Sequence, residues 1–251
     1  MRLKEKICLV VGASSGMGRE TALRIVREGG VLIAAARRTD AVDALVAEAR
    51  AEGGSAHALN LDGTDPASIT TGFAWIEAEF GRLDGVFNNL GATYGNSPLH
   101  ETPDARWHET IATNLTAPFL LMKAEIPLLK AAGGGAIVNN SSSAGVRGVR
   151  AMSDYAASKW GLIGLTQSAA LDYGPDDIRV NVIAPGIIET EKAAELKAQM
   201  PDLFEQLRSE IPLGRFGQMS DIAGLVTWLL SDEARYLTGA TIRIDAGQTI
   251  G

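Results

Sequence analysis

The chain has 251 residues, of which 46% are hydrophobic, and a formal net charge of −7 at pH 7. This length and apolar content suffice for a single compact domain that spans residues 1–251. The negative charge argues against nucleic acid and anionic membranes as partners, because both repel an acidic surface. No run of about 18 apolar residues could span a bilayer, so we expect no membrane partner.

The cysteine and histidine content argues against disulfides and against a metal site. Cys8 lies in an apolar run and is expected to be a small buried hydrophobe rather than a nucleophile. One cysteine allows no internal disulfide, and the first residues lead into a strand without a signal-peptide core, so we expect a cytoplasmic protein. His57, His100 and His108 show no metal-ligand spacing, so no metal site is predicted.

The first part of the chain has the pattern of a strand, a glycine-rich turn and a helix. Residues 6–12 are apolar and β-branched, as in a buried parallel strand, and residues 19–27 have helical periodicity. Between them, Gly12, Gly16 and Gly18 allow the backbone to approach a pyrophosphate, and the helix start presents free N–H groups to it. The spacing differs from G-x-G-x-x-G but serves the same purpose, so the segment predicts a nucleotide site.

Strand and helix patterns then alternate along the chain. We predict further strands at 31–36, 55–60, 83–88, 136–141, 178–183 and 241–245, and helices at 66–80, 105–130, 153–173 and 221–230. Pro118 and Pro127 are expected to kink or bound the long helix at 105–130. The alternation predicts a doubly wound α/β fold of the Rossmann type, a mostly parallel seven-stranded sheet with helices on both faces, in a single domain.

The helix at 153–173 carries a pair of residues suited to proton transfer. Tyr155 and Lys159 are four positions apart and therefore share one face of the helix. A phenol, with a pKa of about 10, is a poor base at neutral pH until a nearby cation favours its anion, and Lys159 is such a cation. The pair suits proton exchange with an alcohol or a carbonyl oxygen. Without its context, such a pair is usually a half-buried ring and a solvated charge.

Several motifs in fixed order carry a family resemblance from about Leu3 to Gly247. They are Gly12-x-x-x-Gly16-x-Gly18, Asp62, Asn88-Asn89-Leu90-Gly91, Asn114, Ser142, Tyr155-x-x-x-Lys159, Asn181 and Pro185-Gly186. On these residues the chain resembles the short-chain dehydrogenase/reductase family. It departs from the family at Val11 (usually Thr), at Leu90 (usually Ala) and in Asp245-Ala-Gly (often Asp-Gly-Gly). Leu90 is expected to reshape the pocket near the cofactor.

The resemblance implies hydride transfer between a nicotinamide cofactor and a ketone or secondary alcohol. Tyr155 would be the general acid in reduction and the base in oxidation, and Lys159 would lower its pKa and hold the nicotinamide ribose. Ser142 would donate a hydrogen bond to the substrate oxygen, and Asn114 would hold a water that joins Lys159 to solvent. Taken singly, Ser142 could merely end a strand, and Asn114 could be a polar helix residue tied to the backbone.

The resemblance also implies a cofactor site and a cofactor. Asp62 with Gly63 would contact the adenine, and Asn88 would line the cleft. The small Ala36 followed by two arginines usually accompanies NADP(H) in the family, because a guanidinium pairs well with the 2′-phosphate. The alternatives are NAD(H), or arginines that are solvated charges opening the next helix. The implied cofactor-binding residues are Gly12, Ser14, Ser15, Gly16, Met17, Gly18, Arg37, Arg38, Asp62, Gly63, Asn88, Gly91, Tyr155, Lys159, Pro185, Gly186, Ile188 and Thr190.

Residues 187–215 correspond to a mobile lid over the active site in the family. An apolar stripe at helical spacing usually faces a core, but in a lid helix it would face the substrate. This stripe consists of Leu196, Met200, Leu203, Phe204 and Leu207. Arg147 and Arg150 could pair with a substrate carboxylate or phosphate, although such arginines are more often solvated or at subunit contacts. Further candidates for the pocket walls are Tyr94, Met152 and Ile188.

The expected partners are a small carbonyl or alcohol substrate and further copies of the chain in a homotetramer, the latter carried over from the family. A 3-oxoacyl-carrier-protein reductase is an alternative, but an acidic carrier would prefer a basic surface and the net charge is −7. An NAD-dependent sugar or polyol dehydrogenase is a second alternative. A catalytically silent nucleotide-binding protein is disfavoured, because the Tyr, Lys and Ser set is complete.

Overall fold

The protein is described by a computed structural model that covers residues 1–190 and 198–250. Seven parallel strands form one sheet in the order β3-β2-β1-β4-β5-β6-β7. The strands are β1 Ile7–Val11, β2 Val31–Ala36, β3 Ser55–Asn60, β4 Gly85–Asn88, β5 Gly135–Asn140, β6 Ile178–Pro185 and β7 Thr241–Ile244. The α-helices are α1 Gly16–Arg27, α2 Thr39–Ala51, α3 Pro66–Phe80, α4 Asp104–Ile111, α5 Ala117–Ala131, α6 Ser153–Tyr173, α8 Pro201–Ser209 and α9 Met219–Leu230.

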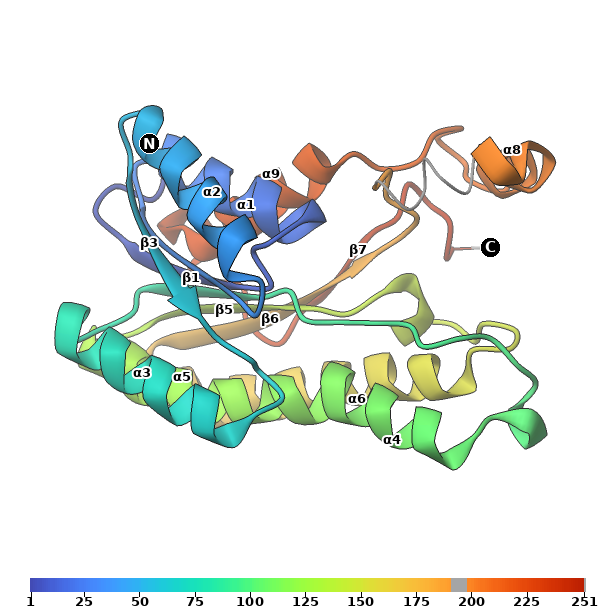
Figure 1. The fold of residues 1–251 in the computed structure, drawn as a ribbon, viewed down its shortest axis with the longest axis horizontal. Helices are drawn as coiled ribbons and strands as arrows, with labels where there is room; N and C mark the ends of the chain where they lie inside the picture. Colours follow the sequence, from blue (N-terminus) through green and yellow to red (C-terminus); the bar gives the residue numbers. More distant parts are fainter. Residues whose placement is uncertain (191–197, 251) are drawn as a thin grey trace.

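Helices cover both faces of the sheet, as predicted (Figure 1). One apolar core joins the sheet to α1, α2 and α9, and a second joins it to α3, α5 and α6. The central strands are buried on both sides, which is why their sequences are nearly continuous apolar runs rather than alternating ones. Within the described residues, no helix is both long and apolar enough to cross a membrane.

The strand order reverses between β1 and β4, which are neighbours in the sheet. Ligands of open α/β sheets bind outside the carboxyl ends of the strands at this kind of switch point. Here the loop that starts at Gly12 meets the residue after β4, because the Asn89 side chain donates to the Gly12 carbonyl at 3.2 Å. The topology therefore places the glycine-rich loop at the expected crevice.

The long helix predicted at 105–130 is present but interrupted. Between α4 and α5, Ala112–Thr116 form a short π-helix, labelled η2. Pro118 has no N–H to donate to the carbonyl of Asn114, four residues earlier, so a regular α-helical hydrogen bond cannot form there. Pro127 lies inside α5 without ending it. The sequence therefore predicted where the long helix is interrupted, but not that the interruption is a π-helix.

Candidate active site

The four predicted catalytic residues come from three elements and converge at one place. Lys159 of α6 is buried, and its Nζ donates to the carbonyl of Asn140 at 2.9 Å and lies 5.7 Å from the centroid of the Tyr155 ring. Tyr155 shares a side-chain hydrogen bond with Ser142, which follows β5. The structure thus brings the phenol, the hydroxyl and the ammonium together.

Gly91 links this group to Asn114 of the π-helix. A Cβ at Gly91 would lie 2.9 Å from Lys159 Nζ and 3.6 Å from Asn114 Oδ1. A side chain at this position would press on the lysine Nζ, so the glycine that ends the Asn-Asn-Leu-Gly motif lets the backbone pass close to the ammonium.

Burial shifts the pKa of both Lys159 and Tyr155. It lowers the pKa of Lys159 to about 8, because the protein interior disfavours the ammonium. Burial also raises the pKa of Tyr155, against the opposing effect of its hydrogen bond with Ser142. The expectation that Lys159 lowers the Tyr155 pKa is thus not met in the isolated chain, where desolvation of the phenolate outweighs the hydrogen bond with Ser142.

Protein groups bind both N–H groups of the Asn114 side chain and one lone pair of its Oδ1. Its Oδ1 accepts from the N–H of Ala92 at 2.8 Å, and its Nδ2 donates to the Ala92 carbonyl at 2.9 Å and to Ser158 Oγ at 3.2 Å. The side chain therefore has no free N–H, and only the second lone pair of Oδ1 remains for a water. The main-chain carbonyl of Asn114 faces Pro118, which has no N–H to donate to it.

The glycine-rich loop has the shape of a phosphate cradle. A Cβ at Gly18 would lie 2.2 Å from the Gly12 carbonyl oxygen, and one at Gly12 would lie 2.8 Å from the Asn89 carbonyl oxygen. At Gly16, by contrast, φ is +55° and no atom lies within 4 Å of a Cβ. Two glycines thus close the turn while the third borders open space, and the residues fit a dinucleotide over the start of α1.

The two arginines after β2 have different surroundings. Arg38 Nη2 donates to Ser14 Oγ and Ser15 Oγ, each at 2.9 Å, and so lies on the glycine-rich loop. Partial burial works to raise the pKa of Asp62, but hydrogen bonds from Thr64 and the charge of Arg37 outweigh it and hold that pKa below its usual value. Arg38 therefore reaches the phosphate loop, and Arg37 acts on the acidic residue after β3.

The Asn88 side chain does not line the cleft, which corrects the expectation from sequence. It is 2% exposed, and its Nδ2 donates to Glu125 Oε2 at 3.2 Å and to Asn139 Oδ1 at 3.1 Å beneath the sheet. Successive side chains of a strand point to opposite faces, so the next residue, Asn89, is the one that reaches the loop. Asn140 Nδ2 donates to Asn89 Oδ1 at 2.8 Å. Sequence analysis missed this pairing, although strand alternation in the two Asn-Asn pairs is its signal.

Two further glycines of the predicted cofactor site, Gly63 and Gly186, lie in tightly packed turns. A Cβ at Gly63 would lie 2.5 Å from Leu90 Cδ1, so the residue that departs from the family fills the space above Gly63. A Cβ at Gly186 would lie 2.9 Å from Asp245 Cα, which holds the turn after β6 against the turn after β7. Both glycines allow close packing around the cleft.

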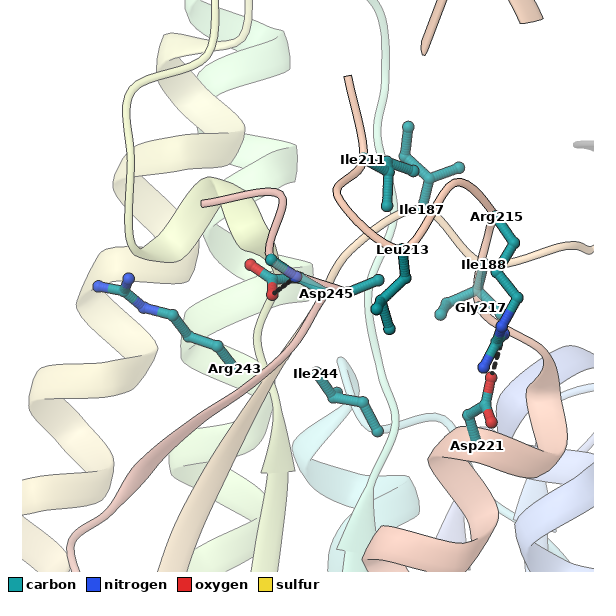
Figure 2. Close-up of a pocket in the computed structure, with 12 residues that line it drawn as sticks. Ile187, Ile188, Ile211, Leu213, Arg215, Gly217, Asp221, Arg243, Ile244 and Asp245 are labelled. Atoms are coloured by element: carbon teal, nitrogen blue, oxygen red, sulfur yellow. Dashed lines mark hydrogen bonds and ion pairs between the residues drawn. The ribbon is translucent and has the colours of Figure 1, made fainter. Parts of the chain in front are cut away.

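A separate cavity of about 340 Å³ lies between the segment after β6, residues 211–217 and the end of β7 (Figure 2). Ile187, Ile188 and Leu213 form part of its apolar wall, and Arg215 and Asp221 form an ion pair at 2.9 Å across one side. None of the four catalytic residues lines this cavity. The cavity is therefore distinct from the group around Tyr155, which remains the candidate active site.

The described part of residues 187–215 packs against Phe216. Phe204 of α8 stacks edge-to-face on Phe216 with ring centroids 4.4 Å apart, and Ile211 joins this cluster. Leu196, the first residue of the predicted stripe, lies outside the described residues. Arg147 Nη1 donates to the Gln248 carbonyl at 3.3 Å, so this arginine contacts the C-terminal segment. Within residues 1–190 and 198–250, no group of three or more His, Cys, Asp or Glu side chains could hold a metal ion.

Comparison with known proteins agrees with this geometry. Residues 12–249 match a family model described as enoyl-(acyl carrier protein) reductase. The chain is 36% identical to cyclohexanol dehydrogenase of Acinetobacter sp. (strain SE19), over 99% of this chain and 96% of that protein. It is 37% identical to a 3-oxoacyl-[acyl-carrier-protein] reductase of Thermotoga maritima, over 100% of both chains. The crystal structure of levodione reductase superposes with a TM-score of 0.94 at 32% identity, over 100% of both chains.

The chain belongs to the short-chain dehydrogenase/reductase family. It is an oxidoreductase that acts on alcohols or ketones, and its family uses a nicotinamide dinucleotide, NAD(P)(H).

Proposed function

We propose that the protein transfers a hydride between NADP(H) and a ketone or secondary alcohol, with Tyr155 as the acid and base. The observation that carries this proposal is the convergence of Tyr155, Ser142 and the buried ammonium of Lys159. A phenol that shares a hydrogen bond with a hydroxyl and lies beside a cation is suited to exchange a proton with an oxygen atom.

The residues divide the chemistry among them. A bound nicotinamide supplies the hydride in reduction and accepts it in oxidation. The Tyr155 hydroxyl gives its proton to the carbonyl oxygen in reduction and takes it back from the alcohol in oxidation, while Ser142 Oγ donates a hydrogen bond to that oxygen. Lys159 would hold the nicotinamide ribose, and its positive charge stabilises the phenolate that remains after proton transfer.

The main-chain carbonyl of Asn114 would connect Lys159 to solvent through a water. The missing N–H of Pro118 leaves this carbonyl without its α-helical donor, and Asn114 lies beside Gly91 and the lysine. Such a water would return the proton that Tyr155 gives away.

NADP(H) is the proposed cofactor because two arginines follow β2 in place of an acidic residue. Arg38 already lies on Ser14 and Ser15, and Arg37 lies near enough to Asp62 to stabilise its carboxylate. Two guanidinium groups at this position favour a phosphate on the adenosine ribose over a free hydroxyl. NAD(H) is the alternative.

The substrate is proposed to be a small ketone or secondary alcohol, with residues 187–215 as the lid over it and the cytoplasm as the place of action. The names of the relatives cyclohexanol dehydrogenase and levodione reductase support this substrate class, whereas the Thermotoga relative supports a 3-oxoacyl thioester. A sugar or polyol remains a further alternative.

The test is an assay of purified protein at 340 nm with each nicotinamide cofactor and a panel of cyclohexanone and cyclohexanol, linear ketones and alcohols, a 3-oxoacyl thioester and polyols. We expect turnover of a ketone or secondary alcohol that is faster with NADP(H). Turnover of the thioester alone would establish the carrier-protein alternative. No turnover of any member with either cofactor would contradict the proposal.

A further inference from the structure

The segment between β4 and α4, residues 92–102, runs from the end of β4 toward α4 and lies beside the loop before α6 (Figure 1). At one end, the backbone of Ala92 exchanges two hydrogen bonds with the Asn114 side chain, at 2.8 and 2.9 Å. Further along, the N–H of Ser97 donates to the Ala151 carbonyl at 3.0 Å. The segment is therefore attached on both sides of the Tyr155 and Lys159 pair.

Arg106 of α4 is the centre of these attachments. Its Nε donates to Asp154 Oδ2 at 3.1 Å, and its Nη2 donates to Ser97 Oγ at 2.8 Å and to Thr102 Oγ1 at 2.9 Å. A Cβ at Gly95 would lie 3.3 Å from Arg106 Nη1, so the backbone of the segment rests directly on the guanidinium. One side chain thus joins the segment to the start of α6.

The ion pair is buried next to the catalytic tyrosine. Asp154 directly precedes Tyr155, and the side chains of Asp154 and Arg106 are only 2% and 12% exposed. Thr110 Oγ1 also donates to Asp154 Oδ2, at 3.1 Å. A buried carboxylate without its cation would be strongly unfavourable, so the two side chains are expected to stay paired in the folded protein. Ala151, at φ +60°, lies in the left-handed region that L-residues avoid, and its carbonyl takes part in the same attachment.

We propose that Arg106 and Asp154 are positioning residues that hold residues 92–102 against the start of α6 and so fix the wall of the substrate site beside Tyr155. This inference rests on the proposed function. The ion pair touches none of the reacting atoms, and its two charges compensate each other. Its role is to keep the wall at one distance from the tyrosine while substrates enter and leave.

Four variants of the full chain separate positioning from stability. Arg106→Met leaves the Asp154 carboxylate buried and unpaired, and Asp154→Asn removes the negative charge. The double variant Arg106→Met/Asp154→Asn removes both charges but also the bonds to Ser97 and Thr102. Arg106→Lys keeps the charge without the fork of donors. The control is Arg27→Met, which breaks an exposed ion pair with Glu52 on another part of the surface.

The measurements are KM and kcat for the best substrate of the panel, the NADPH and NADH dissociation constants, thermal stability, and hydrogen exchange of residues 92–102 in the cofactor-free protein. We expect the double variant to recover the stability lost in Arg106→Met, yet to show a substrate KM raised about 10-fold or more, with little change in kcat or in cofactor binding. The amide of Ser97 should exchange about 10-fold faster or more. Arg106→Lys should fall between the wild type and the double variant, and Arg27→Met should match the wild type.

Two results would overturn the inference. One is a double variant with the substrate KM of the wild type. The other is unchanged exchange of the Ser97 amide, which is measured without turnover and therefore decides the matter even if no substrate is found. Inactivity of the wild type would bear on the proposed function instead.

Discussion

At the scale of single residues, the buried ammonium of Lys159 dominates the electrostatics of the site. Its Nζ donates to the Asn140 carbonyl and lies near the Tyr155 ring, and burial lowers its pKa to about 8. The pKa of Tyr155 is raised. Lys159 Nζ lies 5.7 Å from the centroid of the Tyr155 ring, so the proton lost by the ammonium changes the charge beside the phenol.

Alcohol oxidation needs this pair to accept a proton. We therefore expect kcat/KM for oxidation to rise with pH through about 8 and then to level, because the lysine pKa lies there. Reduction, which consumes the proton, should show the opposite trend. In Lys159→Met the inflection should move upward toward the titration of the phenol. An oxidation rate that is flat between about pH 6 and 10 would contradict this assignment.

The arginines after β2 are expected to set the cofactor preference. A charge-assisted hydrogen bond contributes roughly 1.5–3 kcal/mol, or about one to two powers of ten in affinity for NADP(H) over NAD(H). Arg37→Leu and Arg38→Leu should each reduce this preference. The larger reduction should come from the arginine that binds the 2′-phosphate directly. Ala36→Asp should reverse it by repelling the phosphate and accepting from the free hydroxyl.

The measurement is kcat/KM with both cofactors for the wild type and these three variants, at low and high salt. The preference should weaken as salt rises, because an exposed contact between phosphate and arginine is screened. A wild type that prefers NAD(H), or a ratio that none of the variants changes, would refute the NADP(H) assignment.

Sequence alone named four candidate catalytic residues that the structure brings together, since each lies in a short motif whose position along a strand or helix is fixed by local pattern. It did not give the direction of the Asn88 side chain, which depends on which face of the sheet the side chain meets and on the buried partners Glu125 and Asn139 there. It also did not give the sign of the Tyr155 pKa shift, because desolvation depends on everything packed around the ring. Local motifs predict which residues meet, and tertiary burial determines how they titrate.

At the scale of elements, α5 carries a charged residue type where a core residue would be expected. Glu125 is fully buried, and it accepts from Asn88 Nδ2 at 3.2 Å. Burial raises its pKa to about 8, against the smaller opposing effect of that hydrogen bond. The carboxyl is therefore protonated in the folded protein at neutral pH, whereas the unfolded chain holds an ionised glutamate there.

The folded state thus binds one more proton than the unfolded state between about pH 4.5 and 8, so stability falls as the pH rises through this window. The amide of Glu125→Gln does not titrate, so the variant lacks this pH dependence. The wild type should lose stability between pH 5 and pH 8 and Glu125→Gln should not. The difference in free energy of unfolding, variant minus wild type, should therefore increase by on the order of 2–4 kcal/mol over this range. Urea unfolding at several pH values measures this, with the exposed Glu77→Gln as control. A difference that does not change with pH would mean that Glu125 is ionised in the fold.

The order of the strands and most of the helices could be predicted, because buried parallel strands are continuous apolar runs and helices show their own period. No bounds were predicted for α2, and α4 and α5 were expected as one helix. Boundaries were less accurate. The first helix begins at Gly16 rather than Arg19, because glycines have no side chain to extend an apolar pattern. The π-helix at Ala112–Thr116 had no sequence signal beyond Pro118, since its register depends on how α4 and α5 pack.

At the scale of the whole molecule, α6 exposes an apolar stripe on the side away from the sheet. Trp160 is 51% exposed and Leu171 is 82% exposed. Ala157, one turn before Trp160, and Gly164, one turn after it, are also exposed on the same side of the helix. Phe119 of α5 is also exposed, at 44%. Stripes of this kind on a stable protein usually mark a contact with another chain.

We expect a homotetramer whose dimers form through α5 and α6, so light scattering at micromolar concentration should give four times the chain mass. Trp160→Glu/Leu171→Glu should place charges in the contact and shift the mass to smaller species, whereas Ala51→Glu, on the exposed end of α2, should leave it unchanged. A monodisperse monomer of the wild type would contradict the proposed assembly.

The most direct test of the central claim is the pairing of turnover and cofactor binding in Tyr155→Phe. The ring still packs, and only the transferable proton is lost. Turnover of the best substrate should therefore fall by a factor of about 10² to 10⁴ or more, while the NADPH dissociation constant stays within about threefold of the wild type. A variant that keeps more than about a tenth of wild-type turnover would show that Tyr155 is not the acid and base.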